Sequence, residues 1–213
     1  EPSEIQAACI PLLLKEGTEV VGQAQTGTGK TAAFALPILE TVDEEKKSVQ
    51  ALILTPTREL ALQVSEEINS LKGDRKTEVT PIYGGASMEI QLRKLKRGVQ
   101  IVVGTPGRIL DHIKRGTLDL SNLVFMVLDE ADEMLSMGFS ESIDTILAGV
   151  PEEHNTLLFS ATMSREIERI SKKYLREAKE IVVGSRNEGA ETVNHVYYLV
   201  HARDKYLALK RIV

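Results

Sequence analysis

Residues 19–31 read EVVGQAQTGTGKT, and this segment is the strongest indication of the fold class. Its first half is an apolar run that predicts a buried strand, and its last residues open a helical pattern. Between the two, Gly27 and Gly29 allow the backbone to curl until its N–H groups face a chain of phosphates. The pattern matches the phosphate loop G-x-x-x-x-G-K-[ST], except that Ala24 stands in the place of the first glycine. A glycine-rich turn before a helix is the plainer alternative, but the Lys30-Thr31 pair favours a nucleotide site.

This loop predicts how a nucleoside triphosphate is bound. Lys30 should reach the β- and γ-phosphates and assist catalysis, while the Thr31 hydroxyl should hold Mg²⁺. The helix that starts near Lys30 adds the positive end of its dipole. The predicted ATP-binding residues of the loop are Ala24, Gln25, Thr26, Gly27, Thr28, Gly29, Lys30 and Thr31.

Apolar runs alternate with helical patterns along most of the chain. Further strands are predicted at residues 50–55, 77–83, 100–104, 123–128, 156–159 and 180–183, and helices at residues 56–71, 87–96, 106–115 and 165–175. The runs do not alternate apolar with polar residues, which is typical of strands buried on both faces. The sequence therefore predicts an α/β domain with a mostly parallel central sheet and helices on both faces.

Composition excludes several classes of protein. The net charge of −5 and a pI near 5.5 argue against binding nucleic acid by bulk charge, so any such site must be local. No apolar run approaches a membrane span. Cys9 is the single cysteine and cannot complete a zinc site with four scattered histidines. A reducing compartment, the cytoplasm, is expected.

An acidic string, Asp129-Glu130-Ala131-Asp132, follows the most apolar predicted strand. Ligands of open α/β sheets bind outside the carboxyl ends of the strands. Asp129 is therefore placed to bind Mg²⁺, and Glu130 is the candidate catalytic base or positioner of an attacking water. Taken alone, the string could equally be the solvated acidic start of a helix.

The string DEAD after a loop reading AQTGTGKT resembles the DEAD-box ATP-dependent RNA helicases, in particular their N-terminal RecA-like domain. The resemblance implies a RecA-like P-loop fold, ATP and Mg²⁺ as cofactors, and RNA as a partner. It also assigns Ser3 and Gln6 to ATP binding, with Gln6 reading the adenine. The residues themselves leave an alternative open, because Ser3-x-x-Gln6 is also a helix capping box.

Two turns, Thr55-Pro56-Thr57-Arg58 and Thr105-Pro106-Gly107-Arg108, share one layout at a strand end and helix start. A threonine before the helix and a proline at its first position make good helix starts, which is the bland interpretation. Helix N-termini with an arginine also bind phosphate. The resemblance assigns RNA-backbone contacts, without sequence specificity, to Pro56, Thr57, Arg58, Gly84, Gly85, Thr105, Pro106, Gly107 and Arg108.

Ser160-Ala161-Thr162 follows another predicted strand, and its hydroxyls suit a helix cap. By the resemblance, Ser160, Thr162 and Asp132 couple the ATP site to a cleft between two domains, and the hydroxyls are expected to bond Asp132 and its neighbours.

The expected organisation is a RecA-like ATP-binding domain at residues 1–183, a linker at 184–192, and the start of a second RecA-like domain at 193–213, with a strand at 193–200 and a helix at 203–213. The chain is read as a fragment that lacks the second domain and the arginines by which that domain reaches the γ-phosphate. Its expected activity is RNA-stimulated ATP hydrolysis that unwinds short RNA duplexes. Two alternatives stay open: a DNA translocase of related fold, and an ATP-gated RNA clamp that does not unwind.

Overall fold

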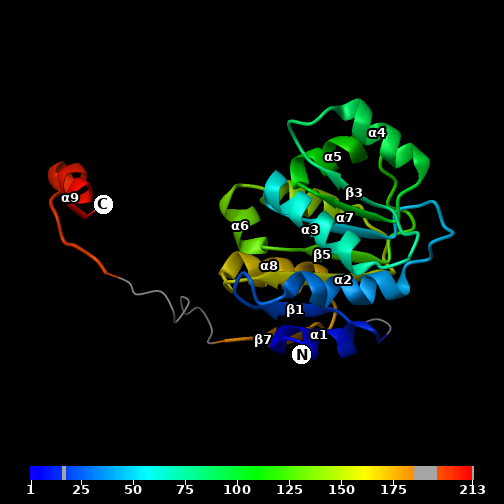
Figure 1. Ribbon diagram of the computed structural model, residues 1–213, viewed down its shortest axis with the longest axis horizontal. Helices are drawn as coiled ribbons and strands as arrows, with labels where there is room; N and C mark the ends of the chain where they lie inside the picture. The colour runs from blue at the N-terminus through cyan, green and yellow to red at the C-terminus, as the bar shows by residue number, and fades with distance from the viewer. Residues whose placement is uncertain (16–17, 185–195, 213) are drawn as a thin grey trace.

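The computed structural model describes residues 1–15, 18–184 and 196–212. Its centre is a sheet of seven strands in the order β3-β4-β2-β5-β6-β1-β7 (Figure 1). The strands are β1 Val20–Gln23, β2 Ala51–Leu54, β3 Val79–Ile82, β4 Ile101–Gly104, β5 Phe125–Leu128, β6 Asn155–Ser160 and β7 Lys179–Val182. Each of the seven strands predicted up to residue 183 is confirmed. The neighbouring strands all pair in parallel, so this sheet is more uniform than the mostly parallel one expected.

Helices cover both faces of the sheet (Figure 1). Three of them pack on one face: α1 Glu4–Leu13, α2 Lys30–Thr41 and α3 Arg58–Leu71. The other face carries α5 Pro106–Lys114, α6 Ala131–Ser136, α7 Ser140–Ala148 and α8 Arg165–Tyr174. A further helix, α4 Met88–Arg97, follows edge strand β3, and its Leu95 packs against this second core.

The apolar runs explain both layers. Along β2, Ala51 and Ile53 enter the core beneath α2 and α3, while Leu52 and Leu54 enter the opposite core. All four are fully buried. Successive side chains of a strand point to opposite faces, so a sheet covered on both sides needs apolar residues at every position.

The strand order sorts the motifs at the carboxyl edge of the sheet. Strands β3, β4 and β2 are neighbours, and the turns after them hold the residues predicted to bind RNA. Strands β5, β6 and β1 are also neighbours, and they end at the acidic string, the Ser160–Thr162 triplet and the phosphate loop. The two sets of motifs interleave along the chain but lie in two adjacent blocks in space.

The residues after β7 are described only in part. Of the expected linker at 184–192, only Gly184 is described, and residues 193–195 of the next predicted strand also lie outside the described ranges. Residues 196–200 form no strand, so that part of the prediction is wrong: a strand needs a hydrogen-bonding neighbour, and they have none among the described residues. The predicted helix is present as the 3₁₀ turn Ala202–Asp204 followed by α9 Lys205–Ile212.

No helix within the described ranges has the length and apolar character needed to cross a bilayer.

Candidate nucleotide and RNA site

The phosphate loop joins β1 to α2 and is shaped by its glycines. Gly27 and Gly29 have φ angles of 83° and 87°, a region that side chains with a Cβ rarely adopt. A Cβ on Gly29 would also lie 2.4 Å from Gln6 Nε2, so the loop packs against the start of α1 at this point. The Thr28 hydroxyl donates to the Gln25 carbonyl at 2.8 Å and closes the turn.

Lys30 is the first residue of α2 and is buried beneath the loop. Its Nζ donates to the Ala24 carbonyl at 2.9 Å, so the ammonium is held under the curled backbone. A buried ammonium costs free energy unless anions or acceptors surround it. Asp129, at the end of the neighbouring part of the sheet, is also buried, and the charge of Lys30 acts to lower its pKa.

Asp129 nevertheless binds its proton more tightly than usual. Desolvation raises the pKa of its carboxyl to about 6, and the Lys30 charge and the hydrogen bond from the Glu130 amide offset this only in part. At this buried position, a bound cation would balance the negative charge of the Asp129 carboxylate. Thr31, the next residue of α2, supplies a hydroxyl at the same edge of the sheet.

Replacing the Asp129 carboxylate by a neutral amide should therefore stabilise the ligand-free protein. Because the folded-state pKa of Asp129 lies above the ordinary value of 3.8, stability falls as pH rises from about 4 through 6. We expect Asp129→Asn to raise the free energy of unfolding at pH 7.5 by about 1–3 kcal/mol, and by much less at pH 4.5. Urea denaturation at the two pH values measures this, with the exposed Asp74→Asn as control. A loss of stability at pH 7.5 would show instead that the carboxylate is already compensated.

Glu130 has a strained backbone. It is the N-cap of α6 with φ 52° and ψ 50°, the left-handed region that few residues other than glycine adopt. Burial raises the pKa of its carboxyl to about 7, helped by a hydrogen bond with Glu133 and by the Asp129 charge. Its Oε1 accepts a long bond of 3.4 Å from the Thr26 hydroxyl in the phosphate loop. The sequence signalled the carboxylate but not this conformation, which turns it toward the loop.

Gln6 takes part in a capping box and also contacts the phosphate loop. Its Oε1 accepts from the Ser3 amide at 3.0 Å, which is one half of a capping box. Its Nε2 donates to the Gly29 carbonyl at 3.2 Å, so the same amide also holds the phosphate loop. The reciprocal contact, between the Ser3 side chain and the Gln6 backbone, is also present, although the Ser3 hydroxyl makes no hydrogen bond to a described residue. An amide oxygen and an NH₂ group each have a second position, so Gln6 keeps one acceptor and one donor for a base.

Asp132 and the Ser160–Thr162 triplet are brought together across the ends of β5 and β6. Asp132 Oδ2 accepts from the Thr162 amide at 2.9 Å and from its hydroxyl at 2.8 Å. Ser160 does not bond Asp132, contrary to expectation: it is fully buried and its hydroxyl donates to the Thr162 carbonyl at 2.7 Å. Ser160 thus shapes the turn, and Thr162 makes the contact. An open depression beside them is lined by Thr26, Glu130, Asp132, Glu133, Ser136, Ala161 and Thr162.

The two turns of matching sequence differ in register. In the first, Thr57 caps α3 by accepting from the Leu60 amide at 3.2 Å, and Arg58 is the first helical residue. Pro56 therefore precedes the cap, and its expected place at the first helical position is wrong. In the second, Pro106 does begin α5, after Thr105, and Arg108 is the third helical residue. Thr105 sits at the cap position without a side-chain bond.

Both arginines nevertheless lie against the turn after β3. The Arg58 guanidinium lies 5.2 Å from the centre of the Tyr83 ring, and Arg108 Nη1 donates to the Ala86 carbonyl at 3.1 Å. Gly84 and Gly85 lie between these two contacts, and Gly85 has a φ of 80°. Sequence reasoning did not select Tyr83, although an aromatic beside a Gly-Gly turn was a usable signal.

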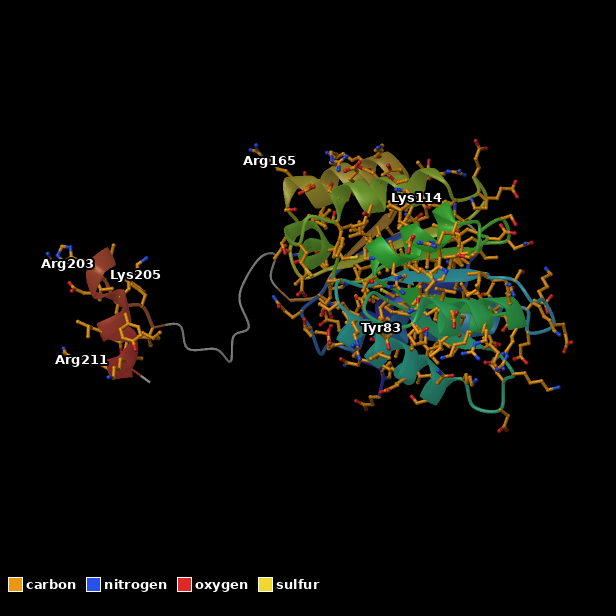
Figure 2. The ribbon with its side chains drawn as sticks, turned by 90° about the horizontal axis from the view of Figure 1, so that it is seen from above. Tyr83, Lys114, Arg165, Arg203, Lys205 and Arg211 are labelled. Carbon is orange, nitrogen blue, oxygen red and sulfur yellow. The ribbon has the colours of Figure 1, made fainter. Side chains whose placement is uncertain are left out.

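The arginines of the α8 region lie elsewhere. Arg165 is exposed and points away from the body of the domain (Figure 2). Arg169 pairs with Asp144, and Arg176 donates to the Glu152 carbonyl.

Burial raises the pKa of the Cys9 thiol to about 12, so the thiol does not ionise at neutral pH. Within the described residues, no three His, Cys, Asp or Glu side chains are grouped as a metal site.

Comparison with known proteins agrees with this geometry. A family model described as DEAD/DEAH box helicase matches residues 3–170. The ATP-dependent RNA helicase DeaD of Escherichia coli strain K12 is 52% identical over 214 residues, which cover 100% of this chain and 34% of the relative. The DEAD-box ATP-dependent RNA helicase CshA of Bacillus subtilis is 47% identical, with 100% and 43% covered.

A solved structure shows the same fold. The crystal structure of a DEAD box protein from the hyperthermophile Methanococcus jannaschii is similar with a TM-score of 0.83 and 46% sequence identity, over 99% of this chain and 56% of that one. The chain spans about a third of the length of the DeaD relatives that it matches. With the fold, the motifs and the family model in agreement, this chain belongs to the DEAD/DEAH box helicase family.

Proposed function

We propose that this chain is the ATP-binding part of an ATP-dependent RNA helicase that works in the cytoplasm. The observation that carries the proposal is the division of one sheet edge into two adjacent blocks. The turns after β5, β6 and β1 present a phosphate loop, the buried Asp129 carboxylate and a polar depression. The turns after β3, β4 and β2 present helix N-termini, glycine backbone and two arginines. The first block suits a nucleotide and the second suits a sugar–phosphate backbone.

The residues present fit MgATP. The left-handed glycines keep the loop backbone curled, as a phosphate cradle requires, and Lys30 lies beneath it. Asp129, buried with a raised pKa, and the Thr31 hydroxyl would hold Mg²⁺. The metal, when bound, neutralises charge on the phosphates. Gln6 retains the donor and acceptor needed to distinguish adenine from guanine, while its other two bonds tie the base site to the loop.

Catalysis by this part of the protein would rest on Glu130. Its carboxylate borders the depression beside the loop, where it can orient a water molecule and take its proton. When ATP binds, the Lys30 ammonium would give up its hydrogen bond to the Ala24 carbonyl and donate to phosphate oxygens instead. Asp132 and Thr162 form the link from this site to the surface that a second domain would cover.

The RNA block would read the backbone without regard to sequence. Its parts are helix N-termini, the open Gly84-Gly85 backbone and the Arg58 and Arg108 guanidinium groups. Contacts of this type position a strand and carry little sequence information.

The residues after β7 would begin the second RecA-like domain. Large apolar side chains are exposed there, including Tyr197 at 85%, Leu199 at 94% and Tyr206 at 74%. So many exposed apolar side chains indicate a segment that packs against other residues of the full-length protein. We propose that residues 193–213 open that domain and that residues 184–192 link it to the first.

The RNA assignment can be tested in the full-length, two-domain protein. Arg58→Ala and Arg108→Ala should each weaken RNA binding by about tenfold, equally for unrelated sequences, and each should lower the slope of log Kd against log salt by about one. Fluorescence anisotropy over a salt series measures this. Arg75→Ala is the matched control, because Arg75 pairs with Glu40 near the amino end of the sheet. Losses confined to one RNA sequence would contradict backbone binding.

A further inference from the structure

Gln91 is a buried polar residue in a helix that carries several charged side chains. It is 4% exposed and is the buried residue of α4, whose sequence MEIQLRKLKR is mostly polar. Burying an amide costs free energy unless its donors and acceptor are satisfied. The partners of Gln91 therefore show what this position is for.

Those partners all belong to the RNA block. Gln91 Nε2 donates to the Tyr83 carbonyl at 3.0 Å. This bond fixes the amide orientation, so that Oε1 faces the other two partners: Arg108 Nη1 at 3.4 Å and His112 Nε2 at 3.3 Å. One amide thus joins the turn after β3 to two residues of α5.

His112 completes the arrangement from behind. It is fully buried, and its Nδ1 lies 2.8 Å from the Thr117 hydroxyl. Burial, and then the Arg108 charge, lower the pKa of His112, which favours the neutral form of the ring. Since Gln91 Oε1 can only accept, a hydrogen bond between it and the ring requires a proton on His112 Nε2. The Thr117 hydroxyl, which lies beside Nδ1, also donates to the His112 carbonyl at 3.0 Å. The His112 ring thus holds the Gln91 oxygen in place.

Both arginines of the RNA block depend on the same turn. Arg108 donates to Ala86 at its far end, and the Tyr83 ring lies against Arg58 at its near end. Between them, a Cβ on Gly84 or Gly85 would meet no described heavy atom within 4 Å. The glycines leave the backbone open to a ligand, but they provide no packing that would fix it. The restraint must come from outside the turn, and Gln91 supplies it.

We propose that Gln91, oriented by His112, is the positioning residue of the RNA site: it holds the turn after β3 and, through it, both Arg58 and Arg108 in a binding-ready arrangement before RNA arrives. A site fixed in advance loses less conformational entropy on binding. This inference rests on the proposed RNA function, and it adds a residue that contacts no RNA itself.

The test uses the full-length protein and a single-stranded RNA oligonucleotide. Gln91→Met keeps the size of the side chain and removes its hydrogen bonds; it should weaken RNA binding by about tenfold. Gln100→Met is the matched control: Gln100 is also buried and its side-chain amide is also hydrogen-bonded, to the backbone of Glu44, Lys46 and Glu78, but at the amino end of β4. Both changes should lower the melting temperature, and only Gln91→Met should lower RNA affinity. Affinity for ATP without RNA should stay unchanged in both variants.

A double-mutant cycle separates positioning from general damage. If Gln91 acts through Arg108, Gln91→Met should cost much less in an Arg108→Ala background than in the parent protein. Should Gln91→Met fail to fold, Gln91→Glu replaces it, because it keeps an oxygen for Arg108 and loses the donor to Tyr83. Equal RNA affinity of the two methionine variants, or full additivity with Arg108→Ala, would overturn the inference. If Arg108→Ala alone leaves RNA binding intact, the proposed RNA site fails, which is a different result.

Discussion

Residues 1–213 alone should bind MgATP and hydrolyse it about 10³–10⁵ times more slowly than the same residues joined to the second domain, with little response to RNA. The depression beside Glu130 is lined by carboxylates, hydroxyls and alanine, and none of the described lining residues is an arginine. Within the part of the chain that the structure describes, Lys30 is therefore the cation placed to meet the charge that develops on the transferred phosphoryl group. An arginine supplied across a domain cleft contributes a factor of this size in related phosphoryl-transfer enzymes.

Steady-state ATPase assays on the short and the two-domain chain, each with and without RNA, measure the difference. Calorimetry with ATP on the short chain is the control, because it shows that slow turnover is not loss of binding. Vigorous RNA-stimulated hydrolysis by residues 1–213 would contradict the expectation. It would require a catalytic arginine among those that the structure places at the surface, such as Arg165.

Glu130→Gln in the two-domain protein should lower turnover by about 10²–10⁴, the usual range for loss of a general base, while ATP remains bound. In the parent protein, kcat/KM for ATP should rise with pH through about 7. The pKa of Glu130 is raised to about 7, and only the deprotonated carboxylate can accept a proton. The residual activity of Glu130→Gln should lose this rise.

Glu133→Gln is the informative control. The hydrogen bond with Glu133 is one reason that the pKa of Glu130 is raised. An amide in place of the Glu133 carboxyl should therefore shift the acid limb of the plot of kcat/KM against pH to lower pH, and it should preserve turnover at pH 8. Unchanged turnover in Glu130→Gln would assign the base role to another group. An unshifted profile in Glu133→Gln would leave burial as the dominant cause of the raised pKa.

The sequence by itself determined the parts of this domain. Apolar runs without alternation report burial on both faces, and glycines with Lys30 and Thr31 report a phosphate loop, because both patterns follow from local backbone requirements. Strand positions, helix positions and parallel pairing were all accessible this way. Two local details were not. The turns at Thr57 and Thr105 look alike in sequence, yet their helices start two residues apart in register. Glu130 gave no sign of its left-handed backbone.

Only the tertiary structure decided how those parts combine. The order β3-β4-β2-β5-β6-β1-β7 separates motifs that alternate along the chain into an RNA block and an ATP block. Gln6 was a cap or a base reader in the sequence, and in the structure one amide bonds both Ser3 and Gly29. In the sequence, nothing distinguishes Gln91 and His112 from other helix residues. Their contacts become evident only in the structure, where α4 and α5 bring them together near the end of β3. Local patterns record what each segment must bury or bond, whereas contacts between distant segments depend on how the helices close over the sheet, and no single segment carries that information.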